Sequence, residues 1–180
     1  MRSLIRRLRH RVRAHRVRRW ARTRLRRGDA VILDTETTDL YGHVIQVSVI
    51  DLHGRTLMSD LVRPPTGITP ASTVVHGLTD GDVAAAPPFA QIAPALLSVT
   101  AGRHLLAYNA PYDRDVLIAG FAAAGLDPAH LADPRNWTCL MRARATVQGG
   151  PWVKLGGPHH ALGDCLATLE VLHQLAGDPT

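Results

Sequence analysis

Four carboxylates stand in segments that are otherwise apolar: Asp34, Glu36, Asp113 and Asp164. Asp34 and Glu36 directly follow the apolar run of residues 30–33, and residues i and i+2 of a strand point to the same face of a sheet. Two adjacent carboxylates repel each other and raise one pKa unless a cation lies beside them. Taken alone, the pair also fits two acids exposed to solvent at the end of a strand.

The other two acids lie on apolar faces of expected helices. Asp113 shares a helical stripe with Leu117 and Phe121, which is the stripe that should face the core. Asp164 lies in the first turns of the last expected helix, which is apolar around most of its circumference. Burial of a lone carboxylate costs much free energy, so each needs a partner. A helix-capping role is the alternative for either residue.

Together these acids carry a formal charge of −4 in a segment, residues 29–180, that contains only eight Lys and Arg residues. Among those cations, only Arg114 adjoins one of the four acids. Clustered hard oxygen ligands favour Mg²⁺ or Mn²⁺ over zinc, and two divalent ions would cancel the charge. Paired metals about 3.5–4 Å apart clamp the attacking and leaving oxygens in phosphodiester cleavage. A neighbouring histidine could deprotonate the attacking water.

The elements that must position these acids alternate between strands and helices. Three expected strands followed by helices that alternate with short strands predict a mixed sheet covered by helices, an α/β fold. The region around Pro94 is a weaker helix because proline interrupts the pattern. The expected strands cover residues 30–33, 43–51, 55–62 and 104–107, the expected helices cover 71–76, 89–99, 111–124 and about 159–176, and 137–146 is ambiguous.

The formal net charge of +6 is an average over two unlike segments. Residues 1–28 hold 13 arginines and no acids, which gives +13, whereas residues 29–180 carry −7. The sequence therefore predicts an arginine-rich tail over residues 1–28, disordered or helical, before an acidic globular domain over residues 29–178. Leu4, Ile5, Leu8 and Val12 share one helical stripe, from which Val17, Trp20 and Leu25 depart.

The tail has three interpretations. It is a solvated tail or sequence upstream of the true start, an electrostatic arm for nucleic acid, or a basic amphipathic helix on an anionic membrane surface. A transmembrane segment and a secretory signal are not expected, because no apolar run is long enough. Two cysteines cannot build a disulfide framework, which favours the cytoplasm. The residues proposed to contact nucleic acid are Arg6, Arg7, Arg9, Arg11 and Arg13.

The acids carry a family resemblance. Leu33–Leu40 (LDTETTDL) resembles the first motif of the DEDDh-type 3′–5′ exonucleases, the DnaQ-like proofreading family. Tyr108–Asp113 (YNAPYD) resembles the second motif and His159–Cys165 (HHALGDC) the third. Val75–Thr79 (VHGLT) is similar to a segment between motifs one and two. The matches occur in the family's order across residues 30–175.

The resemblance implies a ribonuclease H-like mixed β-sheet flanked by helices, with assigned roles for the acids. Asp34, Glu36 and Asp164 would bind one metal ion, with Asp34 bridging to a second. Asp113 would hold that second ion, in part through water. His159 would be the general base, because it precedes Asp164 by the five residues seen in the His-type branch of the family.

Other matched positions are less specific. Thr37, Thr38, His76 and Asn109 resemble residues that line the site of the 3′-terminal nucleotide, although roles in turns and caps explain them nearly as well. His160 stands where the Tyr-type branch places its tyrosine, and His159 is favoured over it. Three residues depart from the usual motifs of the family, namely Asp39, Gln46 and Tyr108. The connection from residue 139 to residue 159 is also shorter than in many members of the family.

The resemblance implies a metal-dependent 3′–5′ exonuclease that releases nucleoside monophosphates from single-stranded ends, with DNA favoured. Two alternatives remain at this stage. One is an exoribonuclease that acts on short RNA, because no residue identifiably reads the 2′-hydroxyl. The other is a catalytically silent nucleic-acid-binding module. A DNA polymerase or repair complex would be the partner if the role is proofreading.

Overall fold

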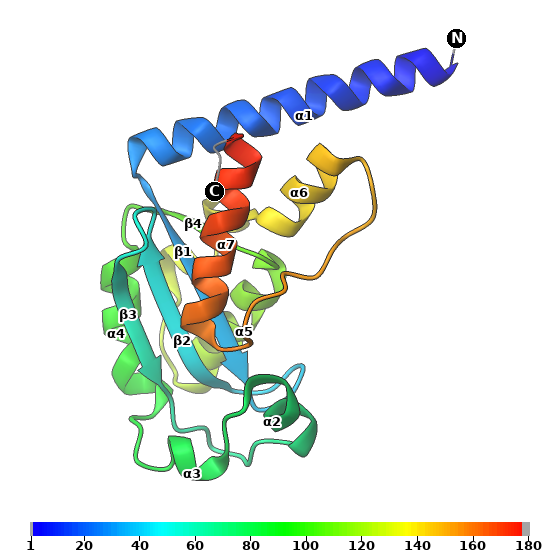
Figure 1. Cartoon of the computed structure of the whole chain (residues 1–180). Helices are drawn as coiled ribbons and strands as arrows, with labels where there is room; N and C mark the ends of the chain where they lie inside the picture. The colour runs from blue at the N-terminus through cyan, green and yellow to red at the C-terminus, as the bar shows by residue number, and fades with distance from the viewer. Residues whose placement is uncertain (1, 178–180) are drawn as a thin grey trace.

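The chain folds around a five-stranded mixed sheet (Figure 1). The structure is a computed structural model that describes residues 2–177, with side chains from residue 5 onward. The spatial order is β3-β2-β1-β4-β5; β1, β2 and β3 are antiparallel neighbours, and β4 and β5 run parallel to β1. The strands are β1 (Ala30–Thr37), β2 (Val44–Asp51), β3 (Thr56–Leu61), β4 (His104–Ala107) and β5 (Trp137–Cys139).

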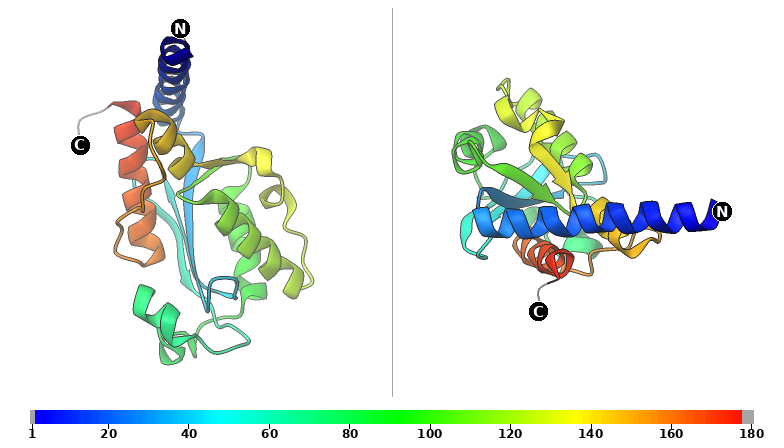
Figure 2. Two further views of the ribbon diagram at one scale, coloured as in Figure 1. Left: turned by 90° about the vertical axis from the view of Figure 1, so that its right-hand side faces the viewer. Right: turned by 90° about the horizontal axis from the view of Figure 1, so that it is seen from above.

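Helices cover both faces of this sheet, as expected for an α/β protein (Figures 1 and 2). α4 (Phe89–Thr100) and α5 (Ala110–Ala123) cover one face, and α7 (Ala161–Ala176) covers the other. Phe89 and Phe121 pack edge to face at 5.2 Å between α4 and α5. The remaining helices are α1 (Arg2–Arg27), α2 (Pro70–His76), α3 (Asp80–Val83) and α6 (Leu140–Gln148), with 3₁₀ turns at Ala129–Leu131 and Pro134–Asn136.

Strand β1 is buried on both faces, which explains its continuous apolar run. Val31 and Leu33 pack in the core beneath α4 and α5, whereas Ala30 and Ile32 pack in the core beneath α7. The strand extends beyond the predicted residues 30–33 and includes the acidic pair. Alternation along β1 therefore places Asp34 and Glu36 on the face that α7 covers.

Three further features of the fold differ from what the sequence predicted. Pro94 does not interrupt α4, because Ile92, Ala93 and Leu96 around it are buried and hold the helix against the sheet. The ambiguous residues 137–146 form β5 followed directly by the start of α6. The short helix α3 was not predicted from the sequence.

The arginine-rich segment forms one helix, α1, which lies across α6 and α7 (Figures 1 and 2). The disordered alternative therefore does not describe residues 2–27. The contact stripe consists of Ala14 and Ala21, which are buried, with the partly buried Val17 between them. This stripe differs from the predicted one, because Ile5, Leu8 and Val12 are 45%, 63% and 45% exposed. Small alanines at seven-residue spacing let α1 approach α7 closely, and large side chains would prevent this approach.

Candidate active site

Three of the predicted acids converge where β1 and α7 meet. Asp34 and Glu36 project from β1, and Asp164 projects from the first turn of α7. One carboxylate oxygen from each lies within 4.8 Å of the other two. Residues 130 positions apart in the sequence thus form one compact all-oxygen group.

Asp113 approaches the same strand end from the other face. Its Oδ1 accepts hydrogen bonds from the Thr35 backbone N–H at 3.1 Å and from the Thr35 hydroxyl at 3.0 Å. Thr35 lies between the two acids of β1, so these bonds fix Asp113 beside Asp34. Asp113 is 3% exposed and is not part of the close group of three. Its second oxygen carries no bond to Thr35.

The pKa values of the four acids are raised, which indicates that the protein does not neutralise the negative charge of these carboxylates. Burial raises the pKa of Asp34 well above its ordinary value, and the charges of Asp113, Glu36 and Asp164 raise it further. Burial also raises the pKa of Glu36 to about 7, with added repulsion from Asp164 and Asp113. Arg114, the one cation adjacent in sequence, forms its ion pair with Asp115 at 2.8 Å.

The same pattern holds for the other two acids. Burial raises the pKa of Asp113 to about 7, although the hydrogen bonds from Thr35 oppose this shift. Burial raises the pKa of Asp164 as well, and the nearby His159 opposes it. Buried carboxylates that destabilise one another and offer only hard oxygen atoms are a donor set that fits Mg²⁺ or Mn²⁺.

Two neighbouring histidines at the start of α7 have different roles. His160 caps the helix, because its Nδ1 accepts a hydrogen bond from the Gly163 N–H at 3.0 Å. His159 is exposed and adopts a left-handed backbone with φ 56°, and its N–H donates to Asp164 Oδ1 at 3.3 Å. The cap occupies the His160 ring, whereas no such cap is formed by the exposed His159.

The glycine before these histidines permits a close approach. A Cβ atom at Gly157 would lie 1.9 Å from Asp164 Oδ1, so any side chain there would displace the carboxylate. The connection from α6 to α7 therefore lies directly against the acid group.

Sequence reasoning missed two residues that support the site. Gln46 lies opposite Glu36 in the β1–β2 register, and its Oε1 accepts a hydrogen bond from the Ala161 N–H at 2.9 Å. Gln46 thereby fixes the first turn of α7, which carries Asp164. The Tyr108 hydroxyl donates to the Val153 carbonyl and so holds the connection that carries His159. Both had been noted only as departures from the family motifs.

The predicted substrate-binding residues divide into two groups. The Thr37 hydroxyl bonds to the Asp39 carbonyl at 2.6 Å and to the Tyr112 hydroxyl at 2.7 Å, and Thr38 Oγ1 accepts from the His43 N–H. Both threonine side chains thus have roles in the turn after β1. His76 has its Nε2 buried beside the Thr37 backbone, and Asn109 is exposed at the start of α5 without capping it.

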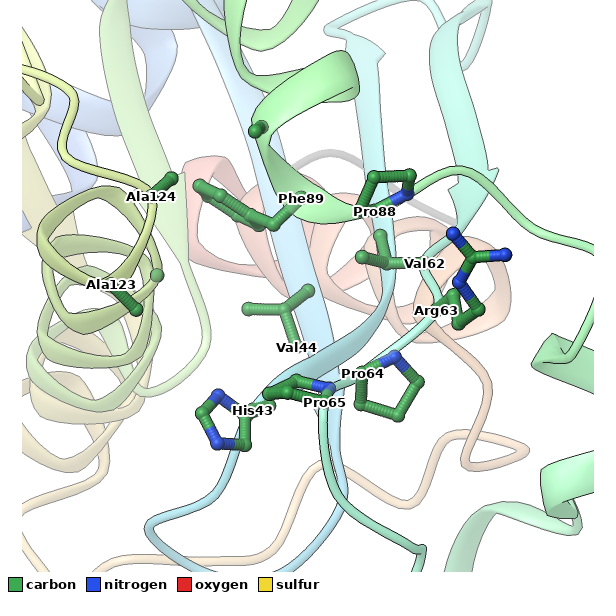
Figure 3. Close-up of a pocket in the computed structure, with 12 residues that line it drawn as sticks. His43, Val44, Val62, Arg63, Pro64, Pro65, Pro88, Phe89, Ala123 and Ala124 are labelled. Atoms are coloured by element: carbon green, nitrogen blue, oxygen red, sulfur yellow. The ribbon is translucent and has the colours of Figure 1, made fainter.

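A separate apolar cavity of about 290 Å³ lies between the starts of α4 and β2 and the end of α5 (Figure 3). Val44, Val62 and Phe89 line its interior, with His43 and Arg63 beside them. None of the four acids lines this cavity, so it is distinct from the acid group.

The sheet order, the helices on both faces and the acids at the end of β1 define a ribonuclease H-like exonuclease fold. Residues 31–172 match the exonuclease family of ribonuclease T type, and the chain belongs to this family. The resemblance inferred from the motifs is thereby confirmed. None of the helices within residues 2–177 is long and apolar enough to cross a membrane.

Known proteins similar to this chain are named as nucleases or polymerase subunits. An uncharacterized exonuclease of Escherichia phage 186 is 30% identical over 172 residues, covering 82% of this chain and 88% of the relative. A DNA polymerase III subunit epsilon-like protein of Rhodobacter capsulatus is 35% identical over 166 residues, covering 81% of this chain and 23% of the relative. The structure of exonuclease X with 5′ overhanging duplex DNA superposes with a TM-score of 0.59 at 26% identity, covering 83% and 94%.

Proposed function

We propose that this exonuclease removes nucleotides from the 3′ end of single-stranded nucleic acid, with DNA favoured, by a two-metal mechanism. The observation that carries the proposal is the group of Asp34, Glu36 and Asp164 within 4.8 Å, for which the described side chains supply no ion pair. With two Mg²⁺ or Mn²⁺ ions bound, Asp34, Glu36 and Asp164 would hold one, and Asp113 together with Asp34 would hold the other. The ions would stabilise the charge that develops on the attacked phosphate and on the leaving oxygen.

The protein's own groups position the reaction around the terminal phosphodiester. His159 accepts a proton from the attacking water, whose oxygen bonds to phosphorus while the bond to the 3′ oxygen of the penultimate nucleotide breaks. The products are a nucleoside 5′-monophosphate and a strand with a new 3′-hydroxyl. The His159 backbone N–H donates to Asp164 Oδ1, and this hydrogen bond holds the base beside one of the proposed metal ligands. General bases of this kind contribute about 10²–10⁴-fold to the rate.

Contacts to the terminal nucleotide come from residues that border the acid group. We assign His76 and Asn109 to direct contact, because His76, at the end of α2, lies beside the Thr37 backbone and Asn109 lies at the start of α5. Thr37 and Thr38 shape the turn that faces the same nucleotide. The preference for DNA is supported by the duplex DNA bound to exonuclease X.

The alternatives from the sequence have less support. The complete set of four acids counts against a catalytically silent module. A polymerase or repair partner is supported by the names of relatives, among them the Rhodobacter capsulatus protein, which is much longer than this chain. A cytoplasmic location remains part of the proposal, based on the two unpaired cysteines, Cys139 and Cys165.

The test is cleavage of a single strand that carries a 5′ label, as DNA and as RNA of the same sequence, in Mg²⁺. The proposal predicts a ladder that shortens from the 3′ end and monophosphate products, with faster loss of DNA. A 3′-phosphate block should slow the first step. Release of the 5′-terminal nucleotide first, or faster cleavage of the RNA, would contradict the proposed direction or substrate.

A further inference from the structure

Helix α1 concentrates positive charge on one surface of the protein. Its arginines are exposed at positions 6, 7, 9, 11, 13, 16, 18, 19, 22, 26 and 27. Among the side chains that the structure describes, only Arg24 and Arg27 of this helix form ion pairs, both with Asp29 at 2.9 and 3.9 Å. The other arginines of α1 therefore leave their charge available to an anionic partner.

The helix is fixed to the domain. Arg22 Nε donates to the Ala176 carbonyl at 2.7 Å at the end of α7, and Ala14 and Ala21 are buried in the interface. His10 lies close enough to Gly149, at the end of α6, that a Cβ there would meet its ring at 2.9 Å. The charge thus sits on a held helix whose first turns extend past α6 (Figure 1).

α1 lies at the end of the sheet where β1 begins (Figure 1). α1 ends at Arg27, β1 begins at Ala30, and Asp34 and Glu36 lie four and six residues further along β1. A strand rises about 3.3 Å per residue, so the two acids lie roughly 13 and 20 Å from the start of β1. A single nucleotide at the acid group is too short to span this distance.

The connection from α6 to α7 links the region beside α1 with the start of α7, which carries Asp164 (Figure 1). A hollow of about 630 Å³ lies between α1 and the end of α6, lined by Arg6, Arg9 and Arg13 on one side and Thr146 and Gly149 on the other. The connection then runs from Gly149 toward His159 and exposes Lys154 on the way (Figure 1).

We propose that α1 binds the phosphodiester backbone of the substrate several nucleotides upstream of the 3′ end that is being cleaved. This inference rests on the proposed function, which places the 3′ end at the acid group. At about 3.4 Å per nucleotide, roughly 13–20 Å corresponds to about four to six nucleotides, or fewer in a stretched strand. This arm, the arginine-rich helix α1, therefore increases the affinity for long strands and does not change the affinity for strands of two or three nucleotides.

The placement of the apolar side chains of α1 favours nucleic acid over a membrane surface. A membrane-binding helix needs a wide apolar face with aromatic anchors. In α1, Trp20 and Leu25 pack against the core beneath α7, and arginines surround the exposed Ile5, Leu8 and Val12. Because residues 29–180 carry −7 and would repel a phosphate backbone, a substrate strand needs a positive surface such as α1.

The test compares the full-length protein with a variant in which Arg6, Arg7, Arg9, Arg11 and Arg13 are changed to Gln. All five are exposed and lie before the buried Ala14, and Gln preserves helix propensity. The matched control changes the same five residues to Lys. Binding of a labelled 40-nucleotide DNA strand is measured in EDTA against salt, and cleavage of 3- and 40-nucleotide strands is measured in Mg²⁺.

If five phosphates are neutralised, the log–log salt slope contains about −3.5 from the arm, or roughly a hundredfold change in affinity between 50 and 200 mM salt. We expect the Gln variant to lose this slope and to raise KM for the 40-nucleotide strand alone, and the Lys control to keep both. An unchanged slope, or equal loss on both strand lengths, would overturn the proposal. Loss of binding to anionic phosphatidylglycerol vesicles with an unchanged DNA slope would assign the arm to membranes instead.

The binding measurement separates this inference from the proposed function. A full-length protein that binds the long strand through the arm but cleaves neither strand would contradict the exonuclease proposal while supporting the arm. If cleavage of both strand lengths does not depend on the arginines of α1, the result would support the exonuclease proposal and contradict the proposed role of α1.

Discussion

At the scale of single residues, the site depends on contacts that residue types alone do not reveal. The spacing of Asp34 and Glu36 predicted that both face one side of a strand, and this alternation is a property of any strand. The two hydrogen bonds from Thr35 to Asp113 depend on how α5 meets β1, so the sequence could not predict them. The bond from Gln46 to Ala161 likewise joins elements 115 residues apart.

Metal binding should stabilise the protein more at high pH than at low pH. The pKa of Glu36 is raised from 4.5 to about 7 in the folded, metal-free protein. A raised carboxyl pKa makes the folded state bind more protons than the unfolded state, so stability falls as pH rises from about 4.5 to about 7. We expect the increase in Tm caused by Mn²⁺ to be larger at about pH 8 than at about pH 5.5.

The control for this measurement is Asp34→Asn. Its metal-free form should be more stable than the wild type at the higher pH, because one member of the repelling group is neutral. It should also lose most of the Tm increase with Mn²⁺. A Tm increase that is equal at both pH values would mean that these acids are not the ligands.

His159→Gln should lower kcat by about 10²–10⁴-fold without loss of metal binding, because a base is removed while all four acids remain. The Tm increase with Mn²⁺ reports the metal site independently of turnover. The matched variant is His160→Asn, which keeps a capping side chain and should retain most of the activity. A larger loss of kcat in His160→Asn than in His159→Gln would reverse the assignment.

At the scale of elements, the periodicity of apolar residues predicted the strands and the long helices. Burial against the core requires apolar residues at these regular spacings. The strand at His104–Ala107 was predicted with its observed bounds, and α7 was placed to within about two residues. The extension of β1 through Thr37 could not be read from composition, since an acidic pair looks like the end of a buried strand. Two acids become favourable at that position when a cation lies beside them, as the proposed metal ion would.

Gln46→Met should reduce both stability and turnover. The side chain is similar in size but leaves the Ala161 N–H without its acceptor, so we expect a loss of about 1 kcal/mol in the free energy of unfolding. Because α7 carries Asp164, kcat should fall more than affinity for a long strand. Gln46→Glu keeps the acceptor and serves as the control for stability. Equal stability of Gln46→Met and wild type in urea would show that the bond contributes little.

At the scale of the whole molecule, α1 is both a charged surface and a covering layer. The division of charge at residue 28 was evident from the sequence, but the packing of α1 was not. The exposed Leu8 and Val12 suggested a different stripe from the buried Ala14 and Ala21. Alanine is only weakly hydrophobic, so a pattern of alanines does not predict the buried face of a helix. The packing of these residues against α7 is known only from the structure.

Ala21→Leu should destabilise the protein by about 1–3 kcal/mol, because a larger side chain overpacks the fully buried contact between α1 and the core beneath α7. Leu8→Ala is the matched control and should have an effect near zero, since Leu8 is 63% exposed. Urea unfolding of both variants measures the difference. If Ala21→Leu were neutral, α1 would not be packed as described.

The most direct test of the central claim is release of nucleoside monophosphate from the 3′ end of single-stranded DNA, measured for wild type and Asp34→Asn with Mg²⁺ and with EDTA. The account predicts release by the wild type in Mg²⁺ only, and a loss of about 10³-fold or more in Asp34→Asn if catalysis depends on the metal ligands. Release in EDTA, or near wild-type release by Asp34→Asn in Mg²⁺, would contradict it.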